Sequence, residues 1–391
     1  MKVKGFLKDV GGASRVTKAR QAKFDQASAN PAPYDPIGAL AKTLHPGFLH
    51  FRVTEVRDAS PTAKTIRFEG AHFPYFMAGQ FMTLRMKIGN SLVTRPYSIS
   101  SSPFQTRGEH PFVEITVRKP RKDGFVADYL YDNVKVGDEF EGEVGLGEFH
   151  YGPIRDAKNV VALAGGSGIT PFLSMAREIR FGNLDMNLTI LFGSVSEDDI
   201  ILRKELEECV CDKVRVVHVL SGENPNWKGE RGFLDAKLIQ KYSQGDTTYF
   251  VCGPQVMYDF VRKALEELKV PARRIRFEVF GAPRDITTFE GYPKELAGEE
   301  FRLTVCQGIH HTVIPAKANE PIAVALERAG LKVHTACRSG ACGFCRIKVL
   351  SGNFYVCPVG DGRRGADKDY GYVHACATYP TSDLKIKINI D

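Results

Sequence analysis

The chain has 391 residues, of which 43% are hydrophobic and 25% are charged, and its formal net charge is +7. This length is enough for two or three domains of ordinary size, and the composition excludes global disorder. No apolar run approaches the ~18 residues that a membrane-spanning helix needs. The lysine-containing start also lacks the apolar segment of a secretory signal. We therefore expect a cytoplasmic protein without a membrane span.

The positive charge lies near the two ends of the chain. Residues 1–47 and 301–391 each carry a basic excess, whereas the middle is slightly acidic. No long Lys/Arg run occurs, and the basic residues do not alternate with aromatic residues as a nucleic-acid groove would require. The pattern argues against a nucleic-acid partner. It fits either a solvated surface or a surface that attracts an acidic protein.

The hydrophobic pattern divides the chain into segments. Residues 1–47 form an N-terminal extension of unknown role. Six short segments rich in β-branched and aromatic residues follow in 48–156, which predicts an antiparallel β-barrel. In 157–280 apolar strands alternate with helices, which predicts an α/β domain with a parallel sheet. The polar stretch 281–300 is expected to be a linker, and 301–391 is a third domain with a cysteine-rich loop.

The cysteines of the third domain have a diagnostic spacing. Five of the nine cysteines fall between residues 337 and 376, and four of them form a C-x4-C-x2-C motif with a distant fourth member: Cys337, Cys342, Cys345 and Cys376. This is the plant-type ligand spacing of one [2Fe–2S] cluster. Zinc is the alternative, but structural zinc sites usually pair two C-x2-4-C units. Cys357 lies outside the pattern and is expected to be a loop thiol.

The loop around these cysteines is rich in glycine. Gly340 and Gly343 lie between the first three cysteines. Glycine lets the backbone approach a ligand closely, because it has no side chain. We expect these two residues to let backbone N–H groups reach the inorganic sulfides of the cluster.

Two further motifs precede the cysteine loop. Arg95-Pro96-Tyr97-Ser98 lies on a predicted barrel strand, and the glycine-rich segment 164–171 lies between a predicted strand and a helix. The N-terminus of such a helix can hold a pyrophosphate. Either motif alone is a weak signal. Their order, about 70 residues apart and followed by the cysteine loop, is much more specific.

Together these motifs identify a resemblance. Residues 301–391, including the segment GYVHACATYPTSDLKIKI around Cys376, resemble plant-type [2Fe–2S] ferredoxins, which implies an α+β (β-grasp) fold. The preceding ~230 residues resemble the ferredoxin–NADP reductase superfamily. The order of flavin, nicotinamide and ferredoxin domains is similar to that of reductases that serve multicomponent oxygenases. The resemblance covers all but the first 47 residues.

The resemblance implies a flavin site on the barrel. Arg95 would bind the flavin phosphate, and Pro96 lies between it and Tyr97, which would stack on or beside the isoalloxazine. Ser98 would form a hydrogen bond near flavin N5. A second phosphate-binding segment begins a helix and consists of Gly124, Phe125, Val126 and Ala127.

The choice between FAD and FMN depends on this helix start. Ala127 stands where the family usually has Ser or Thr, so one hydroxyl donor is missing. The terminal phosphate of FMN carries more charge and normally needs more side-chain donors. A bridging pyrophosphate can be held largely by backbone N–H groups. We therefore expect FAD, with FMN as the alternative.

The resemblance also implies a nicotinamide site. The motif G-G-x-G-x-T-P would hold the dinucleotide, and its matching residues are Gly165, Gly166, Gly168, Thr170 and Pro171. Cys252, Gly253 and Pro254 match a second motif that places Cys252 beside nicotinamide C4. Thr170 would lie at the contact between nicotinamide and flavin. Glu278 and Phe280 match the end of the reductase module, where the family often has an acid and an aromatic residue near the flavin.

The segment after one predicted strand indicates the preferred nucleotide. Ser194 would contact the nucleotide, Val195 is neutral, and three acids follow at positions 197–199. Arg is the natural partner of the NADPH 2′-phosphate, and these acids would repel that group. We expect NADH to be preferred, with NADPH as the alternative.

These expectations define an electron-transfer enzyme. It takes a hydride from the nicotinamide onto flavin, with Ser98, Thr170 and Cys252 around the reacting atoms. It then passes single electrons through the cluster to a separate protein with an acidic docking surface, such as an oxygenase or another metalloenzyme. The alternatives are an anaerobic electron-transfer system, direct reduction of a small molecule at the flavin, and a binding module with a degenerate reductase half. The oligomeric state is not predicted.

Overall fold

The computed structural model describes residues 6–27, 36–37, 39–40, 48–119, 124–283 and 285–388. Contacts divide the chain into two units, Met1–Gly47 and Phe48–Asp391. The first unit contains α1 (Phe6–Asp25), which we did not predict from the sequence. Its second half is rich in Ala, Lys, Arg and Gln, which are good helix formers.

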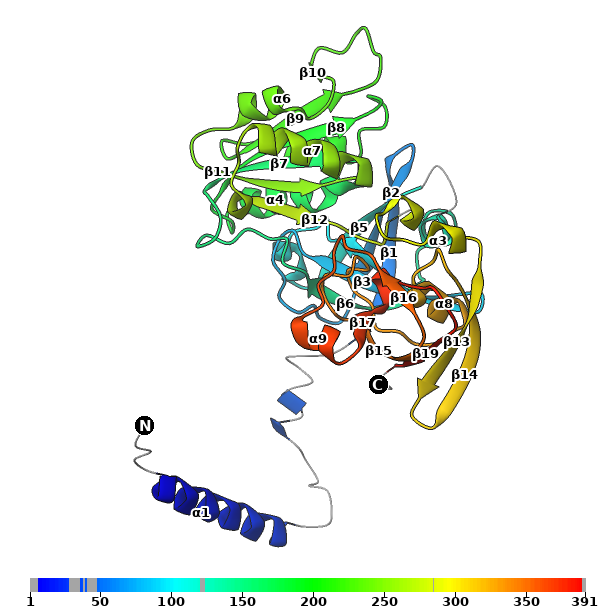
Figure 1. Cartoon of the computed structure of the whole chain (residues 1–391). Helices are drawn as coiled ribbons and strands as arrows, with labels where there is room; N and C mark the ends of the chain where they lie inside the picture. Colours follow the sequence, from blue (N-terminus) through cyan, green and yellow to red (C-terminus); the bar gives the residue numbers. More distant parts are fainter. Residues whose placement is uncertain are drawn as a thin grey trace. The chain divides into compact units, whose positions relative to one another are not determined.

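The first domain of the second unit is an antiparallel barrel, drawn in blue to cyan in Figure 1. Its sheet has the order β4-β3-β6-β1-β2-β5. A bridge between Ile99, just after β4, and Ile115 of β5 joins the two ends of this sheet and closes it. The strands are β1 (Leu49–Ser60), β2 (Ala63–Glu69), β3 (Phe81–Ile88), β4 (Ser91–Ser98), β5 (Phe112–Arg118) and β6 (Glu139–Leu146).

Alternating side chains of these strands fill the barrel. Phe51, Ile66, Leu84 and Ile115 are all fully buried in one core. The short helix η1 (Pro103–Thr106) follows the barrel strands β1 to β4 in the chain, and α3 (Phe125–Asn133) adds its buried apolar face to the same core. The antiparallel barrel expected from the strand pattern is therefore confirmed.

The second domain is a parallel sheet with helices on both faces (Figure 1). The order is β10-β9-β8-β7-β11-β12, so the chain starts at β7 and builds first toward one edge and then toward the other. The strands are β7 (Asn159–Gly165), β8 (Asn187–Ser194), β9 (Val214–Leu220), β10 (Glu230–Arg231), β11 (Thr247–Cys252) and β12 (Ile275–Glu278). The helices are η2 (Gly166–Ile169), α4 (Thr170–Arg180), α5 (Arg203–Glu208), α6 (Ala236–Tyr242), α7 (Gln255–Glu267) and η3 (Ala272–Arg274).

The β7 strand explains why two layers of helices are needed. Val160 and Ala162 pack in one core with α4, whereas Val161 and Leu163 pack in another core with α6 and α7. Successive residues of a strand face opposite sides of the sheet, so a continuous apolar run must be covered on both. The predicted α/β domain is confirmed.

The third domain is a mixed sheet that packs against a helix. Its sheet order is β14-β13-β19-β15-β17, and a small second sheet pairs β16 with β18. The strands are β13 (Glu300–Gln307), β14 (His310–Lys317), β15 (Arg346–Ser351), β16 (Phe354–Val356), β17 (Tyr372–His374), β18 (Thr378–Pro380) and β19 (Leu384–Lys387). The helices are α8 (Ile322–Arg328), α9 (Gly365–Asp369) and η6 (Ala375–Ala377). Buried Ile322 and Leu326 of α8 contact the sheet core, which is the expected α+β arrangement.

The segment expected to be a linker packs on the third domain. It contains η4 (Ile286–Thr288) and η5 (Lys294–Leu296). Tyr292 is buried in a cluster with Cys357 and Tyr379, and its ring meets Tyr355 edge to face at 5.4 Å. The linker is polar in composition, but its few apolar residues attach it to the ferredoxin-like domain.

A buried carboxylate joins the barrel to the α/β domain. Glu114 of β5 is 1% exposed and accepts hydrogen bonds from Arg57 (2.8 Å), Arg67 (2.9 Å) and Arg177 (2.9 Å). Arg57 and Arg67 belong to the barrel, and Arg177 belongs to α4. Burial alone would raise the pKa of Glu114, but the Arg57 hydrogen bond and the charges of Arg177 and Arg57 lower it to about 2.

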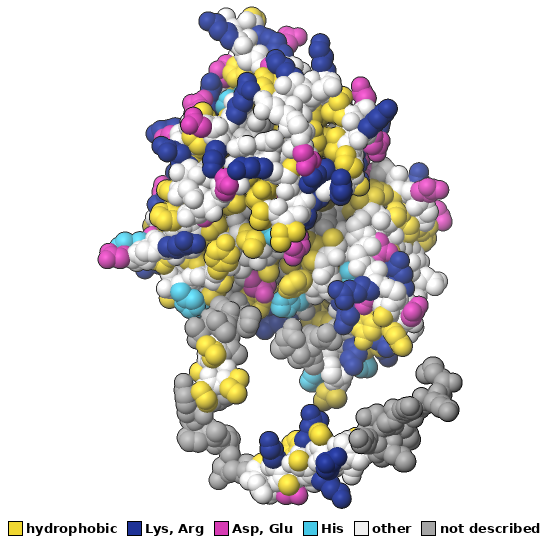
Figure 2. Space-filling model, turned by 90° about the vertical axis from the view of Figure 1, so that its left-hand side faces the viewer, with side chains coloured by type: hydrophobic (Ala, Val, Ile, Leu, Met, Phe, Trp, Pro, Cys, Tyr) yellow, Lys and Arg dark blue, Asp and Glu magenta, His cyan; other side chains and the backbone are white. Residues whose placement is uncertain are grey.

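Charged residues elsewhere are mixed in sign. Figure 2 shows Lys and Arg side chains interspersed with Asp and Glu over the face that it draws. Among the described residues, no helix is both long and apolar enough to cross a membrane.

Candidate functional site

The site forms where the parallel sheet changes direction. β7 ends at Gly165 and β11 ends at Cys252, and these neighbouring strands lead to opposite edges of the sheet. Ligands of such sheets bind beyond the carboxyl ends of the strands at this position. The two nicotinamide motifs therefore lie side by side, although 87 residues separate Gly165 from Cys252.

Close packing explains a glycine of the first motif. A Cβ on Gly168 would lie 2.2 Å from the carbonyl oxygen of Cys252, so any side chain would force the two motifs apart. Thr170 begins α4, and its hydroxyl donates a hydrogen bond to the carbonyl oxygen of Ser167 (3.0 Å). Pro171 occupies the start of the helix, where a missing N–H costs nothing.

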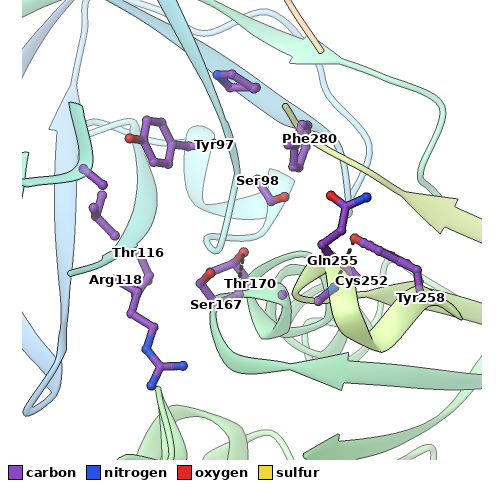
Figure 3. Close-up of a pocket in the computed structure, with 15 residues that line it drawn as sticks. Tyr97, Ser98, Thr116, Arg118, Ser167, Thr170, Cys252, Gln255, Tyr258 and Phe280 are labelled. Carbon is purple, nitrogen blue, oxygen red and sulfur yellow. Dashed lines mark hydrogen bonds between the residues drawn. The ribbon is translucent and has the colours of Figure 1, made fainter. Parts of the chain in front are cut away.

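A cavity of about 290 Å³ lies between the barrel and these strand ends (Figure 3). Figure 3 shows Tyr97 and Phe280 on opposite sides of it, with Ser98 between them. The cavity brings together ten residues that we singled out from the sequence or that lie within its motifs: Pro96, Tyr97, Ser98, Ala127, Ser167, Gly168, Thr170, Cys252, Gly253 and Phe280. Residues from five separate stretches of the chain thus share one space that is suited to a flat ring system.

The flavin motif contributes residues with different surroundings. Tyr97 and Ser98 line the cavity, and burial raises the pKa of the Tyr97 hydroxyl, so it stays protonated. Arg95 does not line the cavity. Its Nη1 donates to both carboxylate oxygens of Glu327 in the third domain, each at 3.0 Å.

The second flavin segment begins α3 as expected. Gly124 is the N-cap residue, Phe125 is exposed and Val126 is buried in the barrel core, whereas Ala127 faces the cavity. The N–H of Gly124 donates to the carboxylate of Asp128 (2.9 Å). The helix start therefore already holds one negative group.

Cys252 is held between two neighbours in the sheet. It pairs with Ala164 of β7 on one side and Glu278 of β12 on the other. It is 5% exposed, and burial, followed by the charge of Glu278, raises the pKa of its thiol. Cys252 is therefore a neutral S–H group at neutral pH and not a thiolate nucleophile.

Glu278 is also buried at this edge of the site. Burial and then the charge of Cys337 raise its pKa to about 8, so the carboxyl is protonated at neutral pH. Its Oε2 has no hydrogen-bond partner among the described residues. Glu278 does not line the cavity, but Phe280, two residues later, does, and its ring meets Phe81 edge to face at 5.1 Å.

A larger cavity of about 890 Å³ extends from the first motif across the ends of β7, β8 and β9. It is lined by the remaining motif residues Gly165, Gly166, Ser194 and Pro254. Phe233 and Phe260 form an apolar wall with ring centroids 5.8 Å apart. Arg118, Ser167 and Gly253 line both cavities, so the two spaces adjoin each other.

The cysteines of the third domain are arranged in two pairs. Cys345 and Cys376 have sulfur atoms 3.1 Å apart. A hydrogen bond from the Cys342 thiol, against the effect of burial, lowers the pKa of Cys337 well below its usual range. None of the nine cysteines forms a disulfide. Among the described residues no three His, Cys, Asp or Glu side chains converge on one ion. A [2Fe–2S] cluster needs only two thiolates for each iron.

The loop backbone fits a cluster as well. Gly340 has φ +89°, and a Cβ there would lie 2.7 Å from the carbonyl oxygen of Gly360. Gly343 also has a positive φ of +80°. The donor set and the tight loop suit four-thiolate coordination, with Cys342 exposed at the surface and the other three cysteines buried.

A short segment connects the cavity to this loop. Phe280 lines the cavity, and the N–H of the next residue, Gly281, donates to the carbonyl oxygen of Cys337 (3.2 Å). The flavin side and the cluster side of the molecule are thus joined through two consecutive residues.

Five residues of the first cavity were not predicted from the sequence: Thr116, Val117, Arg118, Gln255 and Tyr258. Gln255 and Tyr258 follow the second nicotinamide motif on α7, and this proximity could have indicated them. Arg118 lies at the end of β5 and lines both cavities, where it pairs with Asp199 (2.5 Å). No local pattern connects Arg118 with the nucleotide site.

Three family models match the chain in order. An oxidoreductase FAD-binding domain matches residues 50–151, an oxidoreductase NAD-binding domain matches 162–263, and a 2Fe-2S iron-sulfur cluster binding domain matches 307–381. These matches support FAD, NAD(H) and [2Fe–2S] as the cofactors. When they are bound, FAD accepts a hydride, and the cluster exchanges one electron at a time.

Known proteins resemble the chain over most of its length. The glycine betaine monooxygenase reductase subunit of Pseudomonas aeruginosa is 29% identical over 331 residues, covering 80% of this chain and 87% of that protein. The ferredoxin reductase component of 3-ketosteroid-9-alpha-monooxygenase from Mycobacterium tuberculosis is 29% identical over 352 residues, covering 86% and 94%. Ferredoxin–NADP reductase B of Sorangium cellulosum is 32% identical over 239 residues, covering 58% and 95%.

A solved structure shares the complete domain arrangement. Phthalate dioxygenase reductase superposes with a TM-score of 0.63 at 24% identity, covering 88% of this chain and 99% of that one. With the family models and relatives, the conclusion is clear: this chain belongs to the ferredoxin–NADP reductase superfamily and is an NAD(P)H-dependent oxidoreductase with a C-terminal [2Fe–2S] ferredoxin domain.

Proposed function

We propose that this chain is the reductase component of a multicomponent oxygenase or a closely similar two-protein system. It takes a hydride from NADH and delivers electrons one at a time, through FAD and the cluster, to a separate acceptor protein. The observation that carries the proposal is the hydrogen bond from Gly281 to Cys337, next to the cavity residue Phe280. The names of the relatives, which are reductase components of monooxygenases, point the same way.

The proposed roles follow from positions around the cavity. Tyr97 would pack beside the flavin ring, and the Ser98 hydroxyl would offer it a hydrogen bond near N5. Thr170 and the neutral thiol of Cys252 would orient the nicotinamide for hydride transfer to the flavin. Close orientation of the two reacting atoms supplies much of the rate in such a transfer. Arg95 would bind the flavin phosphate while its Nη1 stays paired with Glu327.

The cluster ligands are proposed to be the four motif cysteines. Cys342 is exposed, and the neighbouring Phe344 is 44% exposed. This surface is the natural exit for electrons, because the remaining three ligands are buried. An acceptor that covers Cys342 and Phe344 would approach the cluster without any rearrangement of the domain.

The acceptor is proposed to present an acidic surface. Arg364 and Lys368 are exposed close to the cluster loop in the sequence. Three basic residues contribute less, because Arg363 pairs with Asp361 (2.8 Å), Lys368 also pairs with Asp361 (3.7 Å), and Arg346 pairs with Asp367 (3.1 Å). The positive charge available for docking is therefore smaller than the sequence suggests, and Arg364 is its main source.

The first experiment follows the cofactors in the purified holoprotein. NADH is mixed anaerobically with the oxidised protein while the flavin and cluster absorbances are recorded separately. We expect the flavin to be reduced first and the cluster second. A flavin that is reduced while the cluster stays oxidised would refute the electron route. A variant that lacks the cluster tests the alternative. If it reduces small-molecule acceptors rapidly and protein acceptors at the wild-type rate, direct reduction at the flavin is favoured instead.

The second experiment tests the acidic surface with cytochrome b5 as an acidic acceptor. Its reduction rate should fall as salt rises from ~0.05 to ~0.5 M, because the Debye length shrinks from above ~10 Å to a few Å. Reduction of FAD by NADH should change much less. The double variant Arg364→Glu/Lys368→Glu should reduce cytochrome b5 more slowly than the wild type at low salt. Lys317→Glu on the β13–β14 hairpin is the matched control. Equal rates of cytochrome b5 reduction by the wild type, the double variant and Lys317→Glu would rule out this docking surface.

A further inference from the structure

One buried carboxylate connects the flavin domain with the cluster loop. Glu327 of α8 is 3% exposed, and both of its oxygens accept from Nη1 of Arg95 at 3.0 Å. Its Oε1 also accepts from Nη1 of Arg338 at 2.5 Å. We call these three residues the Arg95–Glu327–Arg338 triad. It spans two domains, because Arg95 belongs to the barrel and the other two residues belong to the ferredoxin domain.

Each arginine stands next to a cofactor motif. Arg95 lies two residues before Tyr97 on β4, and Arg338 directly follows the ligand Cys337. Arg338 has φ +59°, a left-handed conformation that a non-glycine residue adopts only when its surroundings hold it there. The side chain of Arg338 is itself 9% exposed and is held by its hydrogen bond to Glu327. The carboxylate of Glu327 thus connects the flavin motif to the cluster motif by hydrogen bonds to both arginines.

The charges of the triad do not balance by themselves. Two guanidinium groups face one carboxylate, which leaves an excess of one positive charge in a largely buried place. A buried charge is costly unless an opposite charge accompanies it. The missing negative charge is available on both sides: the flavin phosphate would lie next to Arg95 in our proposal, and the proposed cluster ligand Cys337 directly precedes Arg338 in the chain.

A second contact shows that the two domains meet closely here. Gly330 follows α8, and a Cβ on it would lie 3.0 Å from the carbonyl oxygen of Asn90 in the β3–β4 turn. The helix that carries Glu327 therefore packs directly on the hairpin that carries Arg95. Without the carboxylate, Arg95 and Arg338 would repel each other across this contact.

We propose that Glu327 is a positioning residue for internal electron transfer: it holds the ferredoxin domain against the flavin domain in the arrangement that lets reduced FAD pass electrons to the cluster. The inference rests on the proposed function. In each transfer the flavin is oxidised by one electron and the cluster is reduced by one. Because the rate of electron transfer falls steeply with distance, a small displacement of the domains slows this step and leaves hydride transfer unaffected.

The test uses the full-length holoprotein with Glu327→Gln, which keeps the shape of the side chain and removes its charge. Anaerobic mixing with NADH should show flavin reduction at the wild-type rate. The following reduction of the cluster should slow at least about tenfold, which corresponds to ~1.4 kcal/mol. Limited proteolysis provides a readout independent of turnover, and we expect cleavage within residues 281–300 to become faster. FAD and iron contents should match those of the wild type.

Two further variants separate positioning from general stability. Glu327→Asp keeps the charge and should restore part of the cluster reduction rate. Glu320→Gln is the matched control, because Glu320 pairs with Arg328 (2.6 Å) inside the ferredoxin domain. It should leave both electron steps unchanged.

Several outcomes would overturn the inference. One is cluster reduction at the wild-type rate in Glu327→Gln. Another is an equal slowing of flavin reduction and cluster reduction in Glu327→Gln. A third is a cluster reduction rate in Glu327→Asp that is no higher than in Glu327→Gln. Failure of the proposed function itself would look different, since the wild-type cluster would then not be reduced by NADH at all.

Discussion

The backbone N–H of Gly281 donates a hydrogen bond of 3.2 Å to the carbonyl oxygen of Cys337. Both partners are backbone atoms, so this bond uses none of the side chains of the four motif cysteines. Replacing one of those side chains does not remove either partner of the bond. We therefore expect hydride transfer and cluster binding to depend on different residues.

We predict that Cys342→Ser abolishes the cluster and leaves reduction of FAD by NADH largely intact. Cys342 is exposed at the surface of the ferredoxin domain and does not line either cavity. Iron content and the visible spectrum report the cluster, and stopped-flow absorbance reports FAD. Loss of bound FAD or of hydride transfer in a folded Cys342→Ser protein would contradict the prediction.

We predict that Gly340→Ala lowers cluster content several-fold. The positive φ costs a side chain ~1–3 kcal/mol, and the new Cβ would overlap the carbonyl oxygen of Gly360. Gly365→Ala is the control, because a Cβ at Gly365 meets no atom within 4 Å. Iron per FAD in the two purified variants is the measurement. Equal iron contents would show that the loop tolerates the change.

We predict a preference for NADH over NADPH. Arg203 could have served the 2′-phosphate, but Glu197 (3.1 Å) and Glu207 (3.0 Å) already pair with it. Val195→Arg should raise kcat/KM for NADPH about tenfold, the effect of one charge-assisted hydrogen bond of ~1.5 kcal/mol. Val210→Arg, at an exposed position outside the cavities, should have no effect. A wild-type enzyme with lower KM and equal kcat for NADPH would contradict the preference.

We predict that Glu114 stabilises the fold in a pH-dependent way. Its pKa is lowered from 4.5 to about 2 in the folded protein, so the unfolded chain binds the proton more readily. The stabilisation is therefore complete above about pH 4.5 and is lost as the pH falls toward 2. Glu114→Gln should lower the free energy of unfolding by ~3 kcal/mol at pH 7, since three arginines lose their carboxylate.

Denaturant titrations of both proteins between pH 3 and 7 would measure this effect. The difference in the free energy of unfolding between wild type and Glu114→Gln should become smaller as the pH falls. Glu55→Gln is a useful control, because Glu55 pairs with the same Arg57 and Arg67 but is more exposed. A difference that stays constant with pH would show that Glu114 acts through its shape and not its charge.

Much of the fold and the cofactor set could be predicted from the sequence. The C-x4-C-x2-C spacing brings Cys337, Cys342 and Cys345 into one loop by covalent connection alone, so no tertiary information is needed. The glycine motif of residues 165–171 joins a strand to a helix directly, and the continuous apolar run of β7 indicates two covered faces. Each of these signals lies within a few residues of the chain, where local geometry dominates.

Other features depended on the tertiary structure. The helix α1, the packing of residues 281–300 and the cavity position of Arg118 were not predicted. Arg95 contacts Glu327 across 232 positions of the sequence, and no motif indicates that pairing. The sequence by itself determined the three domains and their cofactor chemistry, because those signals repeat or cluster locally. The docking of one domain on another, and with it the path from flavin to cluster, is decided by side chains that meet only after each domain has folded.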